Sequence, residues 1–450
     1  VGTFTNNGSV MMHSDADNSA SYIGGAVGGT FQYDRFLGDN GTGVEGGWHY
    51  LSSPVAGFGS HNMFDYFINT WDEPTSMWVH NEGMPFPDCI PSAEIFMSGM
   101  EGWSVKIDDN YNANPPNNCS LINPGTGATV EFMGAPNFGD QFGTATSTGV
   151  GLYPGFNLVG NPYPSYWYYD GYFFGPNWSG NLFDAIYYWD EDAMQYASYV
   201  NGIGTNGGGP YVPPAQAFFL EAAAADALTF TDAERAHVFG LPYWKDASNI
   251  VKLMASSNGY TDETVIRFGE DYTTARDKSD ARKLMGGSTV PSLYTMASGI
   301  SLSVNGMPAT ESVPVFFECG TSGTYSIETV ETSDFSYLVL EDLLLGTETN
   351  LLEGSYSFDH TTGNAADRFV LHFGPLGIGD NAANSVNIWS SESTIYVNVP
   401  KEMSGTITVY NLMGQEVVST DTQVGTNVIP IDNTNTYYVV KVLSNTNAVT

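Results

Sequence analysis

Basic residues are scarce in this sequence. It contains 13 lysines and arginines against 49 aspartates and glutamates, for a formal net charge of −36, and only Arg35 and Lys106 precede Arg235. A surface with this charge repels the phosphates of nucleic acids and the headgroups of anionic lipids. We therefore expect no nucleic-acid partner, whereas divalent cations would be attracted.

Cysteines and long apolar runs are also few. Cys89, Cys119 and Cys319 show no metal-ligand spacing. Cys89 and Cys119 flank a loop rich in proline and asparagine, so either these two form a disulfide that leaves Cys319 free, or all three are small buried residues. No apolar run approaches the length of a membrane span, and we expect no membrane insertion.

The sequence lacks the motifs of the common catalytic sites. It has no G-x-S-x-G elbow, no HExxH, no CxxC and no glycine-rich phosphate loop ahead of a helix. Carboxylates are numerous, but Asp190, Glu191 and Asp192 belong to an internal repeat, and a catalytic pair is rarely duplicated together with its framework. These observations predict a protein that is not an enzyme.

The sequence is rich in turn residues that separate short strands. Its 51 glycines and 23 prolines divide runs such as "ATVEFMG", "ISLSVNG" and "GTITVYNL", in which apolar and polar residues alternate. This alternation is typical of half-buried strands. The pattern predicts an all-β protein of tandem β-sandwiches with jelly-roll-like character, ending in a small immunoglobulin-like sandwich.

An internal repeat indicates that two modules are duplicates of each other. "GWHYLSSPV" (47–55) and "MFDYFINTWDEPTSMW" (63–78) match "GFNLVGNPYPS" (155–165) and "LFDAIYYWDEDAMQY" (182–196), which aligns Trp71 with Trp189. The same alignment equates 91–97 with 213–220. We expect an N-terminal β segment, two repeated modules, a further sandwich and a terminal domain, with bounds at 1–45, 46–150, 151–240, 241–376 and 377–450.

Several of these motifs resemble a known kind of module. "GFNLVGNPYPS…IYYWDEDAMQY…YVPPAQAFFLEA" and the later "DARKL…LEDLLLGT…ADRFVLHFG" resemble a module that is common in large secreted proteins of the phylum Bacteroidota. The resemblance implies an extracellular protein, located at the cell surface or released from it.

The end of the chain resembles a type A C-terminal sorting domain of the type IX secretion system. The matching features are the strand "IYVNV", the hairpin "VYNLMGQEV" with Tyr410, Asn411 and Gly414, then Gly425 before "NVIPI", and the strand "YYVVKV". Asn411 and Gly414 by themselves predict a turn between two strands. The resemblance implies that the type IX secretion machinery is a partner during export across the outer membrane.

One stretch, "NPYPSYWYYDGYFFGPNWSG" (161–180), is unusually aromatic. Strand alternation would send Tyr166 to one face and Trp167 and Tyr169 to the other, and Gly171 predicts that the chain then loops outward. Exposed Tyr and Trp mark protein interfaces, and sugars stack on the same residues. We predict that these residues form a surface that contacts another module, another subunit or surface glycans; the alternative is ordinary core. The predicted surface residues are Tyr166, Trp167, Tyr169, Tyr172, Phe174 and Trp178.

Two acidic turns suit a calcium ion, which is the one candidate cofactor. "SDADNSA" (14–20) carries Asp15 and Asp17, and "DDNYNANPPNN" (108–118) carries Asp108 and Asp109. Calcium prefers six to eight oxygen ligands, which aspartates and asparagines supply. Neither turn has the EF-hand spacing, so the alternative is a pair of solvated acidic loops.

Together these features favour a non-enzymatic structural or adhesive protein of the cell surface. The alternative is a glycan-binding accessory region of a larger secreted hydrolase. The sorting-domain family usually has a further strand where this sequence stops at Thr450, and the segment 1–14 has no evident partner. Because an open sheet edge accepts an incoming strand, we predict self-association by strand exchange, head to tail, into a filament.

Overall fold

The structure is a computed structural model in which the chain forms two compact units, Val1–His372 and Phe373–Thr450. Each unit is treated by itself. The residues described are 8–15, 19–25, 27–38, 47–63, 65–80, 94–98, 100–107, 122, 127–238, 249–332, 335, 337–373, 387–391, 394–399, 404–411, 413–431, 438–444 and 448–449.

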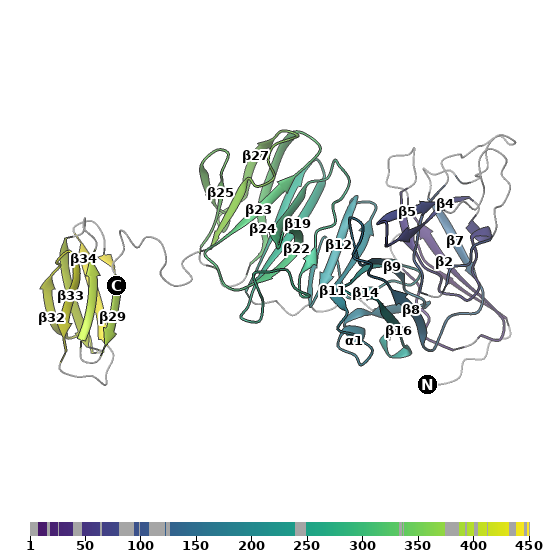
Figure 1. The fold of residues 1–450 in the computed structure, drawn as a ribbon, viewed down its shortest axis with the longest axis horizontal. Coiled ribbons are helices and arrows are strands. Elements are labelled where there is room, and N and C mark those ends of the chain that lie inside the picture. Colours follow the sequence, from purple (N-terminus) through teal and green to yellow (C-terminus); the bar gives the residue numbers. More distant parts are fainter. Residues whose placement is uncertain are drawn as a thin grey trace. The chain divides into compact units, whose positions relative to one another are not determined.

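Strands account for nearly all of the regular structure (Figure 1). The helices in the described part are short: the 3-10 helices η1 (Ser60–Met63) and η3 (Asp232–Glu234), and the single turn α1 (Tyr169–Phe173). The predicted all-β class is therefore confirmed. Its physical basis is the alternation of apolar and polar residues, which lets strands such as Ala128–Met133 bury one face and expose the other, whereas Ala217–Ala222 is buried throughout.

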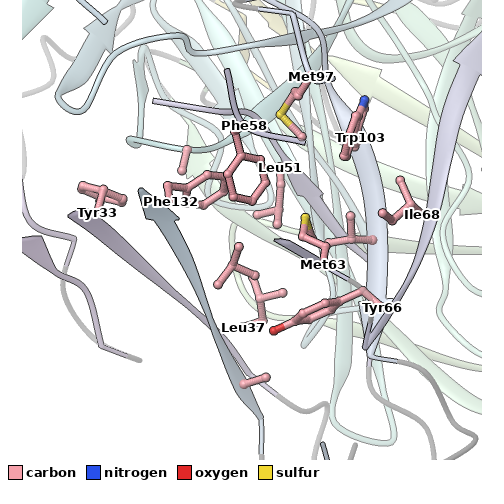
Figure 2. Packing of buried hydrophobic residues seen from close by; sticks show 14 of the residues in the cluster. Tyr33, Leu37, Leu51, Phe58, Met63, Tyr66, Ile68, Met97, Trp103 and Phe132 are labelled. Atoms are coloured by element: carbon pink, nitrogen blue, oxygen red, sulfur yellow. The ribbon is translucent and has the colours of Figure 1, made fainter. Parts of the chain in front are cut away.

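The first module has two small sheets that share one core. Their strand orders are β1-β2-β7 and β3-β6-β4-β5. Figure 2 shows the centre of this core, where the rings of Phe58 and Phe132 lie 4.5 Å apart. The strands are β1 (Ser9–His13), β2 (Thr30–Leu37), β3 (His49–Leu51), β4 (Tyr66–Asp72), β5 (Met77–His80), β6 (Trp103–Ile107) and β7 (Ala128–Met133).

The N-terminal segment is part of this module. β1 pairs in parallel with β2, and β2 pairs with β7. The predicted division at residue 45 therefore does not separate a domain, because the ladder from β2 to β7 crosses it. The predicted donor strand for filament assembly, Ser9–His13, already has a partner in its own chain, which corrects the expectation that it has none.

The second module repeats this plan and adds strands. Its central sheet has the order β13-β12-β11-β15-β9, beside a sheet β14-β10-β17 and the pair β16-β8. The strands are β8 (Gln141–Ala145), β9 (Phe156–Gly160), β10 (Tyr166–Tyr168), β11 (Leu182–Asp190), β12 (Gln195–Val200), β13 (Ile203–Thr205), β14 (Tyr211–Val212), β15 (Ala217–Ala222), β16 (Asp226–Phe230) and β17 (Arg235–Ala236).

The predicted duplication is visible in the strand order. β3-β6-β4-β5 in the first module corresponds to β9-β15-β11-β12 in the second. The equivalent β4–β5 and β11–β12 hairpins both turn through a left-handed residue, Ser76 and Met194, each with φ of 52°. The counterpart of β15 is β6, so the predicted match of 91–97 with 213–220 is wrong. β8 pairs with β16, so the second module also begins before residue 151.

The third sandwich in the first unit is one long sheet folded over on itself. Its strand order is β26-β25-β28-β23-β21-β22-β19-β18-β24-β27, with β20 paired to β22. Phe317 of β23 contacts Phe358 of β27 at 5.0 Å, which closes the two layers. The strands are β18 (Ile250–Ser257), β19 (Tyr260–Phe268), β20 (Ala281–Arg282), β21 (Ser292–Ala297), β22 (Ile300–Met307), β23 (Ser312–Glu318), β24 (Gly323–Thr332), β25 (Leu338–Asp342), β26 (Thr347–Asn350), β27 (Tyr356–His360) and β28 (Phe369–Phe373).

The terminal unit is a small sandwich of two sheets, β29-β30-β33 and β32-β31-β34-β35. Val397, Val409 and Val442 come from both sheets and are fully buried in one core. Its start at Phe373 lies close to the predicted bound at 377. The strands are β29 (Asn387–Ser391), β30 (Thr394–Val399), β31 (Gly405–Asn411), β32 (Glu416–Asp421), β33 (Gly425–Pro430), β34 (Tyr438–Ser444) and β35 (Ala448–Val449).

Candidate functional site

The aromatic stretch lies mainly inside the second module. Trp167 on β10 is 1 % exposed, and its ring stacks on Phe230 at 3.9 Å and on Phe218 at 5.7 Å. Tyr172 contacts the same Trp167 ring at 5.3 Å, and Tyr169 contacts it at 6.0 Å. These rings form the centre of a core rather than a platform.

The prediction that the whole stretch forms a contact surface is therefore wrong for Trp167, Tyr169 and Tyr172. Alternation along β10 does place Trp167 and Tyr166 on opposite faces, and it is the face of Trp167 that is buried. The chain does not loop outward at Gly171, because residues 169–173 form the helical turn α1. One helical turn brings residues three apart to the same side, so Tyr169 and Tyr172 both return to the core.

The other three predicted residues keep some exposure. Phe174 is 75 % exposed, at the end of α1. Trp178 is half-buried and meets Tyr172 edge-on at 5.7 Å. Tyr166 is half-buried and lies close enough to Arg35 of the first module to interact with it electrostatically. Only Phe174 thus offers most of its surface to a partner.

A buried carboxyl, Asp184, lies on β11 in the second module and accepts a hydrogen bond from Asn201 Nδ2 at 3.3 Å. Burial raises the pKa of Asp184 to about 6, although Asn201 and the nearby Lys278 act in the opposite direction. The native state therefore holds the proton more tightly than the unfolded chain. The contribution of Asp184 to stability is therefore greatest below about pH 4, falls as the pH rises towards 6, and stays lower above it.

We expect Asp184→Asn to be more stable than the native chain at pH 7.5, by roughly 2 kcal/mol, and to show no gain at pH 4. Thermal unfolding at both pH values checks this. Asp280→Asn is the matched control: burial raises the pKa of Asp280 to about 6 too, but its carboxylate accepts hydrogen bonds from the backbone amides of Asp277 and Gly306, both at 2.8 Å. It should lose stability, and a gain in both variants would contradict the argument.

The contact between the repeated modules is made by other aromatic residues. Trp71 lies 5.2 Å from Trp78 and 5.1 Å from Phe219 of the second module. Trp71 Nε1 donates to the carbonyl of Phe156 at 2.7 Å, and the hydroxyls of Tyr50 and Tyr196 are 2.7 Å apart. We call this contact the repeat seam; its residues are Tyr50, Trp71, Trp78, Phe156, Tyr196 and Phe219.

Two equivalent glutamates cross the repeat seam in opposite directions. Glu73 of the first module accepts from the Gly155 amide at 2.7 Å and from the Thr148 amide at 3.0 Å. Glu191 of the second module accepts from the Trp48 amide at 3.0 Å. Glu73 therefore caps the start of β9 and Glu191 the start of β3, each an edge strand of the other module, so the seam is reciprocal.

This reciprocity explains the repeated glycine-aromatic motif. A Cβ atom at Gly47 would lie 1.9 Å from Glu191 Cγ, and Gly155 has a φ of 83°, which favours glycine. The repeat was recognisable in the sequence, and Glu191 was noted as part of it. Its role was missed because a sequence repeat shows that two segments fold alike, not that they bind each other.

A second seam joins the second module to the third sandwich. Asn206 Nδ2 donates to Asp262 Oδ1 at 2.9 Å, and the Asn206 amide donates to Glu263 at 2.7 Å. Asp262 is fully buried and pairs with Lys283 at 2.5 Å. The buried charges are thus matched, as they must be where water is excluded.

A cavity of about 300 Å³ lies at one end of the third sandwich, next to Cys319 and His360. His360 Nε2 bonds to the Cys319 carbonyl at 3.0 Å, and the Tyr325 hydroxyl lies 3.1 Å from Cys319 Sγ. These contacts stabilise the end of the sandwich. Cys319 has a free thiol. Cys89 and Cys119 lie outside the described residues, so the predicted disulfide between them stays a prediction.

The calcium prediction can be placed only in part. Asp15 is exposed after β1, whereas Asp17, Asp108 and Asp109 lie outside the described residues. Within the part of the chain that is described, no group of three or more His, Cys, Asp or Glu side chains is arranged to hold a metal ion. In the same part, no helix is long and apolar enough to cross a membrane.

The predicted turn in the terminal unit is confirmed. Asn411 Oδ1 accepts from the amides of Met413 and Gln415, both at 3.0 Å, and Gly414 has a φ of 75°. Tyr410, the residue before this turn, pairs with Glu416 and Val439. Gly425 opens β33 with a φ of 90°, a conformation that favours glycine.

The fold defines an all-β protein with a duplicated sandwich module, a third sandwich joined to it, and a separate terminal sandwich. Residues 28–373 match the family described as a domain of unknown function (DUF8693). Since the match spans more than half of the chain, the chain belongs to this family. No curated protein and no solved structure matches it.

Proposed function

We propose that this chain is a non-enzymatic structural or adhesive protein of the bacterial cell surface, exported by the type IX secretion system. The observation that carries the proposal is the separate compact unit formed by Phe373–Thr450, in which Asn411 and Gly414 form a turn and Gly425 begins β33. These are positions at which the sequence resembles a sorting domain. A sorting signal that is folded by itself can be recognised without disturbing the cargo that precedes it.

The seams support the structural part of the proposal. The repeated modules share buried rings and reciprocal glutamate contacts, and Asn206 of the second module donates hydrogen bonds to Asp262 and Glu263 of the third sandwich. Interfaces with buried apolar residues and matched polar groups resist relative motion of domains. A rigid multi-domain protein of this kind suits a structural or adhesive role outside the cell.

The decisive experiment is a chain that ends at Leu376, which keeps β28 (Phe369–Phe373) whole. We expect it to accumulate in the periplasm, whereas the full chain reaches the cell surface and becomes accessible to added protease. Immunoblots of cell fractions measure both. The full-length variant Phe174→Ala, changed at an exposed position, is the control and should be exported normally. Thermal unfolding of the purified first unit separates a failure of export from a failure to fold, and surface display of the shortened chain would contradict the proposal.

Head-to-tail assembly is still a prediction, and it would require existing strand pairing to be broken. Donating Ser9–His13 to another molecule would break its parallel ladder with β2. On the acceptor side, β34 is already paired with the short strand β35. Strand exchange would therefore have to displace existing hydrogen bonds on both molecules.

A further inference from the structure

Three consecutive leucines are exposed at one hairpin of the third sandwich. Leu343, Leu344 and Leu345 are 53 %, 62 % and 60 % exposed, in the turn between β25 and β26. We call them the leucine tip. Single exposed apolar residues are ordinary, but three in succession at a turn form a contact surface.

The leucine tip is held in place by a buried carboxylate. Asp342 Oδ1 accepts from the Leu344 amide at 2.9 Å, and the Asp342 carbonyl accepts from the Gly346 amide at 2.7 Å. Arg368 in turn binds the carboxylate with Nε at 3.0 Å and Nη2 at 2.6 Å. The exposed leucines are therefore displayed on a fixed turn, so little conformational entropy is lost on binding.

The shape of the tip indicates what it contacts. Successive side chains of a tight turn point in different directions, so a flat protein surface would cover one or two of the three leucines. All three are exposed to a similar degree. A fluid acyl layer surrounds a projecting tip from every side and buries all of them.

Charge determines which lipid surface fits. Apart from the buried Asp342, which is paired with Arg368, residues 337–353 contain Glu341, Glu348 and Glu353 but no lysine or arginine. Glu341 and Glu348 lie directly opposite each other on β25 and β26. This acidic collar is repelled by anionic headgroups, in keeping with the charge of the whole chain, so the lipid must be neutral overall.

We propose that the leucine tip inserts shallowly into the acyl boundary of a zwitterionic lipid surface. The contact involves one turn and no spanning segment, so it is compatible with the expected lack of membrane insertion. It goes beyond the proposed surface function and does not depend on the export route. Three side chains give weak, reversible attachment, which many copies on one surface would strengthen.

Flotation of the full chain with phosphatidylcholine vesicles tests the proposal. We expect partition that falls at least tenfold in the variant Leu343→Ser/Leu344→Ser/Leu345→Ser. Phe174→Ser, which removes a still more exposed apolar residue elsewhere, should float as the native chain does. Phosphatidylglycerol vesicles at low salt should bind less, and high salt should reduce that difference.

Three results would overturn the proposal. One is no flotation of the native chain at millimolar lipid, and another is equal flotation of the triple variant. The third is a native chain that does not float but forms dimers in light scattering that the triple variant loses, which would assign the tip to a second copy. Circular dichroism of the triple variant checks that it is folded, as expected for changes at exposed positions.

Discussion

Replacing Trp167 by alanine is expected to lower the free energy of unfolding by about 3–5 kcal/mol. The indole is 1 % exposed and lies between Phe218 and Phe230 at the centre of the second module. Its removal takes away apolar contacts and leaves a cavity that the surrounding rings cannot fill without leaving their rotamers. Denaturant unfolding followed by near-ultraviolet circular dichroism measures the loss.

Two further variants sharpen this test. Trp167→Phe should cost far less, because Trp167 Nε1 is buried without a hydrogen-bond partner and phenylalanine removes that unpaired donor. Phe174→Ala, in the same stretch but 75 % exposed, should change stability by no more than about 0.5 kcal/mol. Equal losses for Trp167→Ala and Phe174→Ala would show that the stretch is not core.

The variant Glu73→Ala is expected to cost about 3 kcal/mol or more. Glu73 is 4 % exposed, and its carboxylate accepts from the amides of Gly155 and Thr148 and from the Thr148 hydroxyl at 3.2 Å. Alanine leaves these donors without a partner at the repeat seam, and unpaired buried donors are expensive. Glu73→Gln keeps one acceptor and should lose less.

Glu191→Ala is the matched variant on the other side of the repeat seam. Glu191 is half-buried and accepts from the Trp48 amide and, at 2.7 Å, from Trp189 Nε1, so the expected loss is smaller. If the contacts of the repeat seam break cooperatively, the losses in free energy of unfolding for Glu73→Ala and Glu191→Ala are not additive in the double variant. Strict additivity, with no increase in protease cleavage between the modules, would contradict a cooperative seam.

The predictions made from local pattern held best. The turn at Asn411 and Gly414 depends on side-chain hydrogen bonds within a few residues and on one backbone conformation, and both are visible in the sequence. The duplicated modules were likewise predictable, since similar sequences form the same strand order. Alternation along β10 correctly separated Tyr166 from Trp167, but it did not tell which of the two faces is buried.

The predictions that failed concern residues whose partners are distant in the sequence. Trp167, Tyr169 and Tyr172 were assigned to a contact surface, Tyr172 because Gly171 suggested an outward loop. A helical turn instead returns Tyr169 and Tyr172 to the core around Trp167 and Phe230. The domain bound at residue 45 failed because β2 pairs with β7, nearly a hundred positions later. Such pairings are selected by the burial that the assembled sheet provides, which no short segment encodes.

The sequence by itself determined the class of strand, the turns, the duplication and the acidic character of this protein, because each depends on composition or on neighbours along the chain. Only the tertiary structure decided which aromatic residues are core and which join modules, and that Glu73 and Glu191 each cap the other module. The physical reason is that burial and buried hydrogen bonds are properties of assembled surfaces. Equivalent residues in the two repeats have the same local surroundings, and it is the packing of one module on the other that gives them their partners.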